Sequence, residues 1–438
     1  MGNIYNYLKL AWQKESHDFR QNPLPYFVLL VVLTIPLPHI FSSIAAILWV
    51  VLALFLRKKG TPKWNPALVW PLLLYVGLAL SYCWSIAPSL TLSALTKQIP
   101  LLLFPLVFFI HSQWSPEAET KIKNGLAYGY SVFALFWLLK ALVRYCLTGD
   151  QNVFFYHDLV THDVNAIHVS LYVAVAFFIM LEKQVRTLWE WIFMSVLGLV
   201  MVLLSSKNVI IIFLGLFVIR WIQQYRHRVP FRVKMLLGGV SIGLLLLFSG
   251  KIMDRFRLEV ASNTGHETVN RTIGDATNKV YNVTVHQAWN QPTFKANDFF
   301  PGTALRVYQI RIFLEMMGED GQWLTGYGAN ATDEKIQQKR IEHQLYQGYD
   351  VFNFHNQYIQ FFAEIGIIGF IICIIMVFVN LKIAINRKDF VHFSFAILII
   401  SLFLTESFLA RQRGVIYFTL MYCLFTSFSP KGKIKKLL

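Results

Sequence analysis

Residues 352–369 read FNFHNQYIQFFAEIGIIG, a polar stretch that runs directly into a long apolar one. The apolar part is long enough for a helix that crosses a lipid bilayer. His355 stands where the polar loop meets this helix, and an imidazole suits proton transfer near neutral pH. We therefore predict a membrane helix with a titratable side chain at its first turn. The alternative interpretation is an interfacial histidine that only anchors the helix.

The rest of the chain repeats this pattern of apolar runs separated by short polar segments. Of its 438 residues, 55% are hydrophobic and 15% are charged, and the mean hydropathy is +0.48. These values indicate an all-α, polytopic integral membrane protein with about 12 transmembrane helices. The predicted spans are 24–39, 41–56, 66–84, 94–110, 124–146, 165–181, 188–204, 208–222, 234–249, 357–381, 391–409 and 414–428.

Lysine and arginine gather in alternate connections between these spans. The basic segments are 57–59, 121–123, 183–186, 220–234, 382–388 and 431–436. By the positive-inside rule, these segments and both termini are cytoplasmic, and the other connections face outward. Topology thus explains the net charge of +16 without a nucleic-acid partner. Membrane lipids with anionic headgroups are the expected partners of the basic loops.

One outward connection, 251–355, is far longer than the rest, and a loop of this length is usually functional or folded. It divides the chain into spans 1 to 9 in 1–250, a loop subdomain, and spans 10 to 12 in 356–438. Apolar spacing predicts a helix over 304–317, which Gly318 and Gly321 end.

Within the same loop, Gly326-Tyr327-Gly328 predicts a tight turn. The segment 261–298 is weakly patterned and receives no assignment.

Two arginines lie on the predicted loop helix, about 140° apart around its axis. Arg311 has Glu315 at i+4, so a surface ion pair is its simplest role. Arg306 has no such acid and is the better candidate to bind an anion. A third cation, Lys207, sits between two apolar runs, where it either snorkels to the membrane surface or neutralises a lipid-linked phosphate.

Two carboxylates stand in apolar surroundings. Glu406 lies with Arg411 and Arg413 at the outer end of the eleventh span, where an acid is costly unless paired. An internal ion pair with an arginine is the simplest account, and a spare arginine would help to bind a diphosphate. Glu364 lies nine residues after His355, on the opposite face of the helix, so it would pair with another helix.

Histidines and acids cluster in 155–170, which includes His157, His162 and His168. The cluster lacks the H-E-x-x-H pattern, so we predict no metal site there. A P-loop, a dinucleotide-binding glycine motif and a nucleophile elbow are also missing from the sequence, and no cofactor is predicted.

The sequence resembles the O-antigen ligase and polymerase superfamily of membrane glycosyltransferases. His355-Asn356-Gln357-Tyr358-Ile359 and then Glu364-Ile365-Gly366 with Gly369 look like the family's H-N-x-Y-L and E-x-G-x-x-G. Arg306 lies about twenty residues before the Gly-Tyr-Gly turn, which is also similar to the family. Ser206-Lys207-Asn208 is similar to the family's S-R-G, and residues 167–172 look like a stretch seen in its bacterial members. Lys207 replaces an arginine and Asn208 a glycine, so bidentate phosphate binding and close backbone approach are lost there.

The resemblance implies a site and a reaction. The donor is a glycan on undecaprenyl diphosphate, the acceptor of a ligase is lipid A–core, and the transfer is inverting and independent of metal. The site faces the periplasm from the bacterial inner membrane. The implied residues are His355 as the catalytic residue, Arg306, Lys207, Arg311, Arg411 and Arg413 for the donor diphosphate, and His168, Glu364, Glu406, Asn356 and Tyr358 in support.

Three alternatives stay open. A polymerase of the same superfamily would use a second lipid-linked repeat unit as the acceptor, and a protein-directed oligosaccharyltransferase would use a protein. A transporter of lipid-linked sugars belongs to a different class and would show internal repeats and charges near mid-membrane. The candidate cations instead gather at one membrane face, which favours an enzyme.

Overall fold

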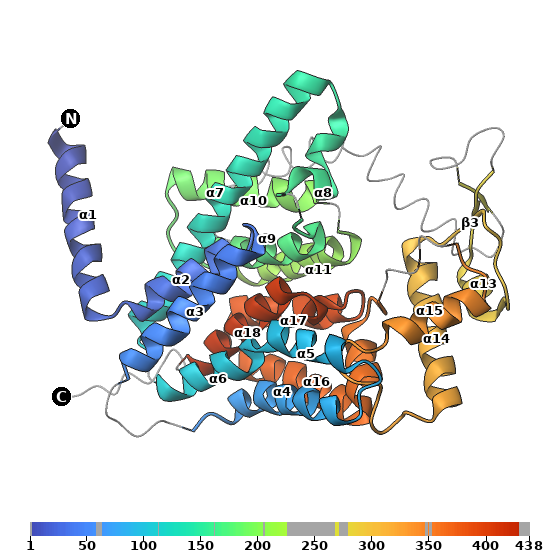
Figure 1. The fold of residues 1–438 in the computed structure, drawn as a ribbon. Coiled ribbons are helices and arrows are strands. Elements are labelled where there is room, and N and C mark those ends of the chain that lie inside the picture. The colour runs from blue at the N-terminus through green and yellow to red at the C-terminus, as the bar shows by residue number, and fades with distance from the viewer. Residues whose placement is uncertain are drawn as a thin grey trace.

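A computed structural model shows a bundle of α-helices with a smaller lobe at one end, formed around α13, α14 and α15 (Figure 1). The structure describes residues 2–57, 64–112, 114–161, 163–204, 206–225, 268–270, 279–346, 349 and 353–428. The predicted ninth span, 234–249, lies outside these residues. The total of 12 spans therefore stays a prediction.

Each of the other predicted spans overlaps one or more helices. The first half of the chain contains α1 (Gly2–Gln21), α2 (Leu24–Thr34), α3 (His39–Phe55), α4 (Val69–Leu80), α5 (Pro88–Gln98), α6 (Pro100–Ile110), α7 (Pro116–Thr148), α8 (Tyr156–Leu159), α9 (Ala166–Leu181), α10 (Leu188–Leu203) and α11 (Lys207–Arg220). The second half contains α13 (Val285–Asn290), α14 (Gly302–Asp320), α15 (Asp333–Glu342), α16 (Gln357–Arg387), α17 (Phe390–Phe403) and α18 (Gln412–Ser427). Short 3-10 turns flank α4 at Pro66–Leu68 and Ser81–Cys83, precede α8 at Gln151–Phe154 and precede α18 at Phe408–Ala410, and α11 runs into a π-helical turn at Trp221–Tyr225.

Among the residues that the structure describes, four helical segments are long and apolar enough to cross a bilayer by themselves: Pro66–Cys83, Pro88–Ile110, Pro116–Thr148 and Gln357–Arg387. Several shorter apolar helices pack beside them. In the core, α9 and α18 are buried along nearly their whole length. Apolar side chains such as Leu54, Leu139 and Ile371 lie exposed on the outside of the bundle, as expected where helices meet lipid. The chain is an integral membrane protein.

The two ends of the bundle differ in their polar contacts. At the end away from the lobe, ion pairs join Lys123 to Asp389 and Arg220 to Glu182. All four residues lie in or beside connections that are predicted to share the cytoplasmic side. We call this the inner end, and the end that carries the lobe the outer end (Figure 1).

The lobe contains the predicted loop helix. α14 runs from Gly302 to Asp320, so it continues through Gly318 and ends at Gly321, whose φ of +67° lies in the left-handed region. Its buried side chains, including Tyr308 and Ile312, form a small core of the lobe with α13.

The unassigned segment 261–298 contributes α13 and two-residue strands to the lobe. The strands are β1 (Thr268–Val269), β2 (Tyr281–Asn282) and β3 (Asp298–Phe299). β2 lies in the middle, antiparallel to β1 and parallel to β3.

Two predicted spans are too long. The first was predicted over 24–39, but α2 ends at Thr34. The eleventh was predicted over 391–409, but α17 ends at Phe403. Glu406 therefore lies in a connection between α17 and α18, outside the helix. We call residues 404–411 the outer connection.

Candidate functional site

α16 begins at Gln357, where the tenth span was predicted to begin, so His355 lies before the first turn and not in it. Asn356 is its N-cap, and the side-chain oxygen accepts hydrogen bonds from the N–H groups of Tyr358 (3.0 Å) and Ile359 (3.2 Å). His355 therefore precedes the first turn and has a φ of +45°. The Asn356 amide also donates to the carbonyl of Leu404 at 3.3 Å, so this cap ties the start of α16 to the outer connection.

The side chain of Glu406 joins two of the predicted site residues. Its Oε2 lies 3.4 Å from Nδ1 of His355, and its Oε1 lies 3.4 Å from an Nη of Arg306. The Glu406 side chain is only 9% exposed, whereas those of His355 and Arg306 are 25% and 31% exposed. A buried carboxylate thus holds an imidazole and a guanidinium that both reach the surface.

The charge state of Glu406 follows from these neighbours. Burial by itself raises the pKa of the Glu406 carboxyl, but the hydrogen bond with His355 and the positive charges of His355 and Arg306 outweigh it, so the pKa lies below its ordinary value. An ionised carboxylate can only accept hydrogen bonds. Nδ1 of His355 therefore carries the hydrogen, and in the neutral ring Nε2 has the lone pair that can take a proton.

Arg306 is held firmly but not saturated. Its Nε donates to the carbonyl of Thr405 and one Nη to the carbonyl of Gly302, each at 3.0 Å. With the contact to Glu406, these bonds occupy three N–H groups of the guanidinium, which has five. The remaining donors and the partial exposure suit an anionic ligand.

The Ser206-Lys207-Asn208 stretch lies beside this group. Asn208 donates to the carbonyl of Ser401 (2.8 Å) and to the hydroxyl of Thr405 (2.9 Å), and it accepts from the Ser401 hydroxyl (2.6 Å). Thr405 therefore contacts both Asn208 and Arg306. Where the resembled family has a glycine, Asn208 joins α11 to the end of α17, and Lys207 is the first residue of α11.

Two supporting residues pack under the outer connection. The ring of His168, in the first turn of α9, is buried with its centroid 4.3 Å from that of Phe408. The Tyr358 hydroxyl donates to the carbonyl of Ile400 in α17 at 3.2 Å. Both side chains help to fix the chain on either side of Glu406.

The other predicted cations lie differently. Arg311 pairs with Glu315 at 2.8 Å, as predicted for its simplest role, and donates to the carbonyl of Gln291 at 2.6 Å. Arg413 donates to the carbonyls of Asp163 (2.5 Å) and Leu37 (2.9 Å) and so joins three outer loops.

Arg411 is exposed at the start of α18, with no side-chain hydrogen bond or ion pair to the described part of the chain. For Arg311, Arg411 and Arg413, a role in donor binding stays a prediction.

Sequence reasoning missed a row of polar side chains on α16. Gln357 accepts a hydrogen bond from the N–H of Leu409 at 2.6 Å, and Gln360 accepts one from the Ser407 hydroxyl at 3.4 Å. The Gln360 amide donates to the buried carboxylate of Glu364 at 2.7 Å. These residues stand at i, i+3 and i+7, so the signal was a polar stripe along an apolar helix.

The Gly-Tyr-Gly turn at 326–328 and the Glu364-Ile365-Gly366 stretch of α16 are joined by backbone hydrogen bonds. In the turn predicted at 326–328, the N–H groups of Tyr327 and Gly328 donate to the carbonyls of Ala363 and Glu364, each at 2.8 Å. α16 breaks at Ile365 and Gly366 to make this possible.

Gly366 and Gly369 have no room for a side chain. Gly366 has a φ of +68°, and a Cβ there would lie 2.0 Å from the carbonyl oxygen of Leu324. A Cβ at Gly369 would meet Ile365 and Phe361 of its own helix. Both glycines serve the break in α16.

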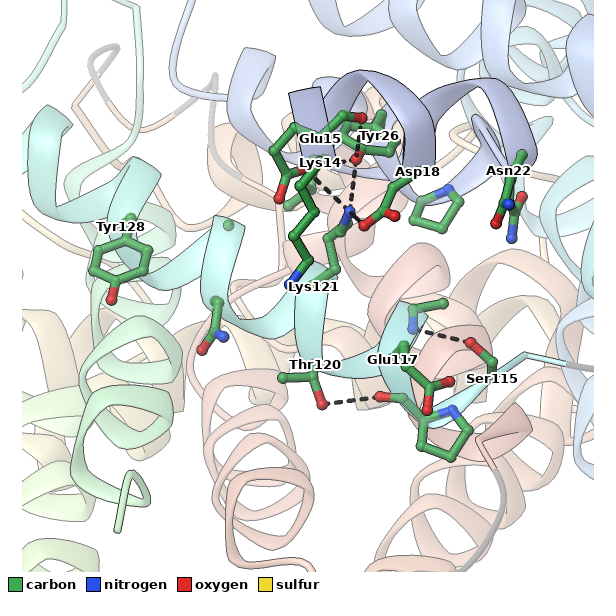
Figure 2. Close-up of a pocket in the computed structure, with 17 residues that line it drawn as sticks. Lys14, Glu15, Asp18, Asn22, Tyr26, Ser115, Glu117, Thr120, Lys121 and Tyr128 are labelled. Carbon is green, nitrogen blue, oxygen red and sulfur yellow. Dashed lines mark hydrogen bonds and ion pairs between the residues drawn. The ribbon is translucent and has the colours of Figure 1, made fainter. Parts of the chain in front are cut away.

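A hollow lies at the inner end, between α1, α2 and the start of α7 (Figure 2). Its lining includes Glu15, Asp18, Tyr26 and Lys121 and contains none of the predicted site residues. It is separate from the group around Glu406.

Comparison with known proteins gives one finding. The family model described as O-antigen ligase, Wzy_C, matches residues 192–374. This range contains Lys207, Arg306 and His355, whereas Glu406 lies beyond it. No match was found among curated proteins.

Proposed function

We propose that this chain, whose residues 192–374 match the family model described as O-antigen ligase, transfers a glycan from undecaprenyl diphosphate to lipid A–core. A ligase- or polymerase-type function follows from the family, and the donor and acceptor are our proposal. One observation carries it. Glu406 holds an imidazole, His355, and a guanidinium, Arg306, side by side at the outer end of a membrane bundle.

In the proposed reaction, Arg306 and Lys207 bind the diphosphate of the donor. Negative charge grows on the leaving diphosphate as the bond from its oxygen to the anomeric carbon breaks. Fixed cations at that position stabilise the transition state more than the ground state. The bonds from Arg306 to Thr405 and Gly302 keep the guanidinium in place without reorganisation.

His355 is the proposed general base. Its Nε2 takes the proton of the acceptor hydroxyl as the hydroxyl oxygen forms a bond to the anomeric carbon. Glu406 holds the ring through Nδ1–H and stabilises the imidazolium that forms. The proton then passes to water. Attack opposite the leaving diphosphate inverts the anomeric centre, and Arg306 and Lys207 supply the charge that a metal ion would otherwise supply.

The proposed location is the bacterial inner membrane, with the outer end in the periplasm and both termini in the cytoplasm. The positive-inside pattern supports this orientation. We propose the same three-part division as above, in which the lobe over 251–355 covers the site.

The test is a transfer assay with purified protein, undecaprenyl-diphosphate-linked glycan and either lipid A–core or a second lipid-linked repeat, with products identified by mass. Glycan on lipid A–core would support the ligase. Growth of glycan on the carrier would identify the polymerase with the same site. Absence of bond formation with either acceptor would refute the ligase proposal and bring the transporter to the front.

A further inference from the structure

α1 has two distinct faces. Trp12 and Phe19 are seven residues apart and therefore share one face of the helix, and their side chains are 76% and 43% exposed. The basic residues Lys9, Lys14 and Arg20 are also exposed. Exposed aromatic and basic side chains on one helix are typical of a helix at a membrane surface.

The placement of α1 fits this location. Figure 1 shows α1 beyond the inner end of the bundle, running across the direction of α4 and α16. Because α16 is long enough to span the bilayer, a helix that runs across it at its end lies along the membrane plane. α1 therefore runs parallel to the membrane surface and does not cross the bilayer.

Contacts to Lys121 hold α1 in this direction. The ammonium group of Lys121 lies 3.0 Å from Glu15 and 2.8 Å from Asp18, and the Tyr26 hydroxyl donates to Glu15 at 2.6 Å. Figure 2 shows these side chains meeting between α1 and α7.

This pairing also sets the charge of α1. Glu15 and Asp18 are its two acids, and both are paired with Lys121. The lysines and arginine of α1 make no ion pair with the described part of the chain, so its surface charge is positive.

Other tryptophans at the inner end point to the same surface. Trp64 and Trp189 stand at the starts of inner-end helical segments and are 69% and 68% exposed. Tryptophan side chains gather at the level of lipid headgroups. Trp12 completes a belt with them.

We propose that α1 lies in the headgroup layer at the inner end, with Trp12 and Phe19 in the lipid and Lys9 and Arg20 against anionic phosphates. This inference does not depend on the proposed glycosyl transfer. Anionic phospholipid is the partner because the helix offers both an apolar face and unpaired positive charge.

Nitroxide labels on the full chain test the position of α1. The four native cysteines are replaced, single cysteines are placed by Trp12→Cys or Phe19→Cys, and Gln13→Cys and His17→Cys serve as matched controls on other faces. The protein is reconstituted in vesicles of phosphatidylethanolamine and phosphatidylglycerol. We expect labels at 12 and 19 to have a higher ratio of oxygen to nickel-chelate accessibility than labels at 13 and 17.

Two results would overturn the proposal. Equal access of the nickel chelate at all four positions would place α1 in water. Shielding of positions 12 and 19 from both reagents would mean that a protein or a second copy covers this face. If the cysteine-free chain does not fold, a photo-crosslinker at position 12 of the native chain gives the same decision: a lipid adduct supports the proposal, and a protein adduct contradicts it.

The charged residues are tested by the double variant Lys9→Gln and Arg20→Gln. In vesicles with phosphatidylglycerol, this variant should increase nickel-chelate access at position 12. In vesicles of phosphatidylcholine alone, the same variant should leave nickel-chelate access at position 12 unchanged. If access in the anionic vesicles stays the same, headgroup binding by these residues is refuted.

Discussion

The imidazole Nδ1 of His355 lies 3.4 Å from the carboxylate Oε2 of Glu406, although 51 residues separate the two in the chain. This contact joins the start of α16 to the outer connection. It sets the tautomer of the histidine, because an ionised carboxylate accepts the Nδ1 hydrogen.

Glu406→Gln tests this contact in catalysis. The amide preserves the size of the side chain but removes the charge that stabilises a protonated His355. We expect the transfer rate to fall by about 100-fold or more, the usual contribution of a positioned general base, with little change in the donor KM. Ser407→Ala, at the neighbouring position, is the control, and its transfer rate should fall much less. Equal losses in both variants would mean that only the conformation of the outer connection matters.

The depressed pKa of Glu406 predicts a pH dependence of stability. A carboxyl whose pKa is lowered by folding stabilises the fold above its unfolded pKa, and this contribution disappears as the pH falls through its folded value. The difference in melting temperature between wild type and Glu406→Gln should therefore shrink as the pH is lowered from 7 through the ordinary carboxyl range. Glu334→Gln, at an exposed position, should show no such trend. A constant difference for Glu406→Gln would contradict the ionised state.

Arg306 and Arg311 offer a matched pair on α14. Arg306→Lys keeps the charge but loses the planar guanidinium, which bonds Thr405, Gly302 and Glu406 at the same time. We expect kcat/KM for the donor to fall by about tenfold or more, which corresponds to about 1.4 kcal/mol of transition-state binding. Arg311→Lys should lower the melting temperature and leave the donor KM nearly unchanged. A loss of kcat/KM in Arg311→Lys but not in Arg306→Lys would indicate that Arg311 binds the diphosphate.

Gly366→Ala tests the break in α16. A Cβ at this position meets the Leu324 carbonyl and forces a left-handed φ on an alanine, so we expect a loss of roughly 1–3 kcal/mol in the free energy of unfolding. Gly215→Ala, in α11, is the control because a Cβ there meets nothing within 4 Å. That variant should be neutral or slightly stabilising. Similar stability of Gly366→Ala and wild type would show that the break is not required.

Local patterns predicted much of the fold. Apolar runs located the described helices of the bundle core, and the spacing after residue 304 located α14, whereas α1, α13 and α15 were not predicted. The ends of elements were less accurate. The end of α17 and the position of His355 before the first turn of α16 depend on the outer connection and on the Asn356 cap, which periodicity does not contain.

The partner of Glu406 shows why the site was harder to predict. The sequence favoured an ion pair with an arginine, and Arg411 and Arg413 stood closest. The structure supplies Arg306 instead, 100 residues away, because the lobe folds back on the outer connection. Such a contact depends on tertiary packing and leaves no mark on local spacing. The break at Gly366 was missed for the same reason, since the turn that fills it comes from the lobe.

The central claim is that His355 takes the proton of the acceptor. The direct measurement is the transfer rate of purified His355→Ala with saturating donor and lipid A–core, beside wild type and a melting curve for each. The account predicts a folded protein whose rate is lower by about 100-fold or more. A folded His355→Ala variant that transfers glycan at nearly the wild-type rate would contradict it.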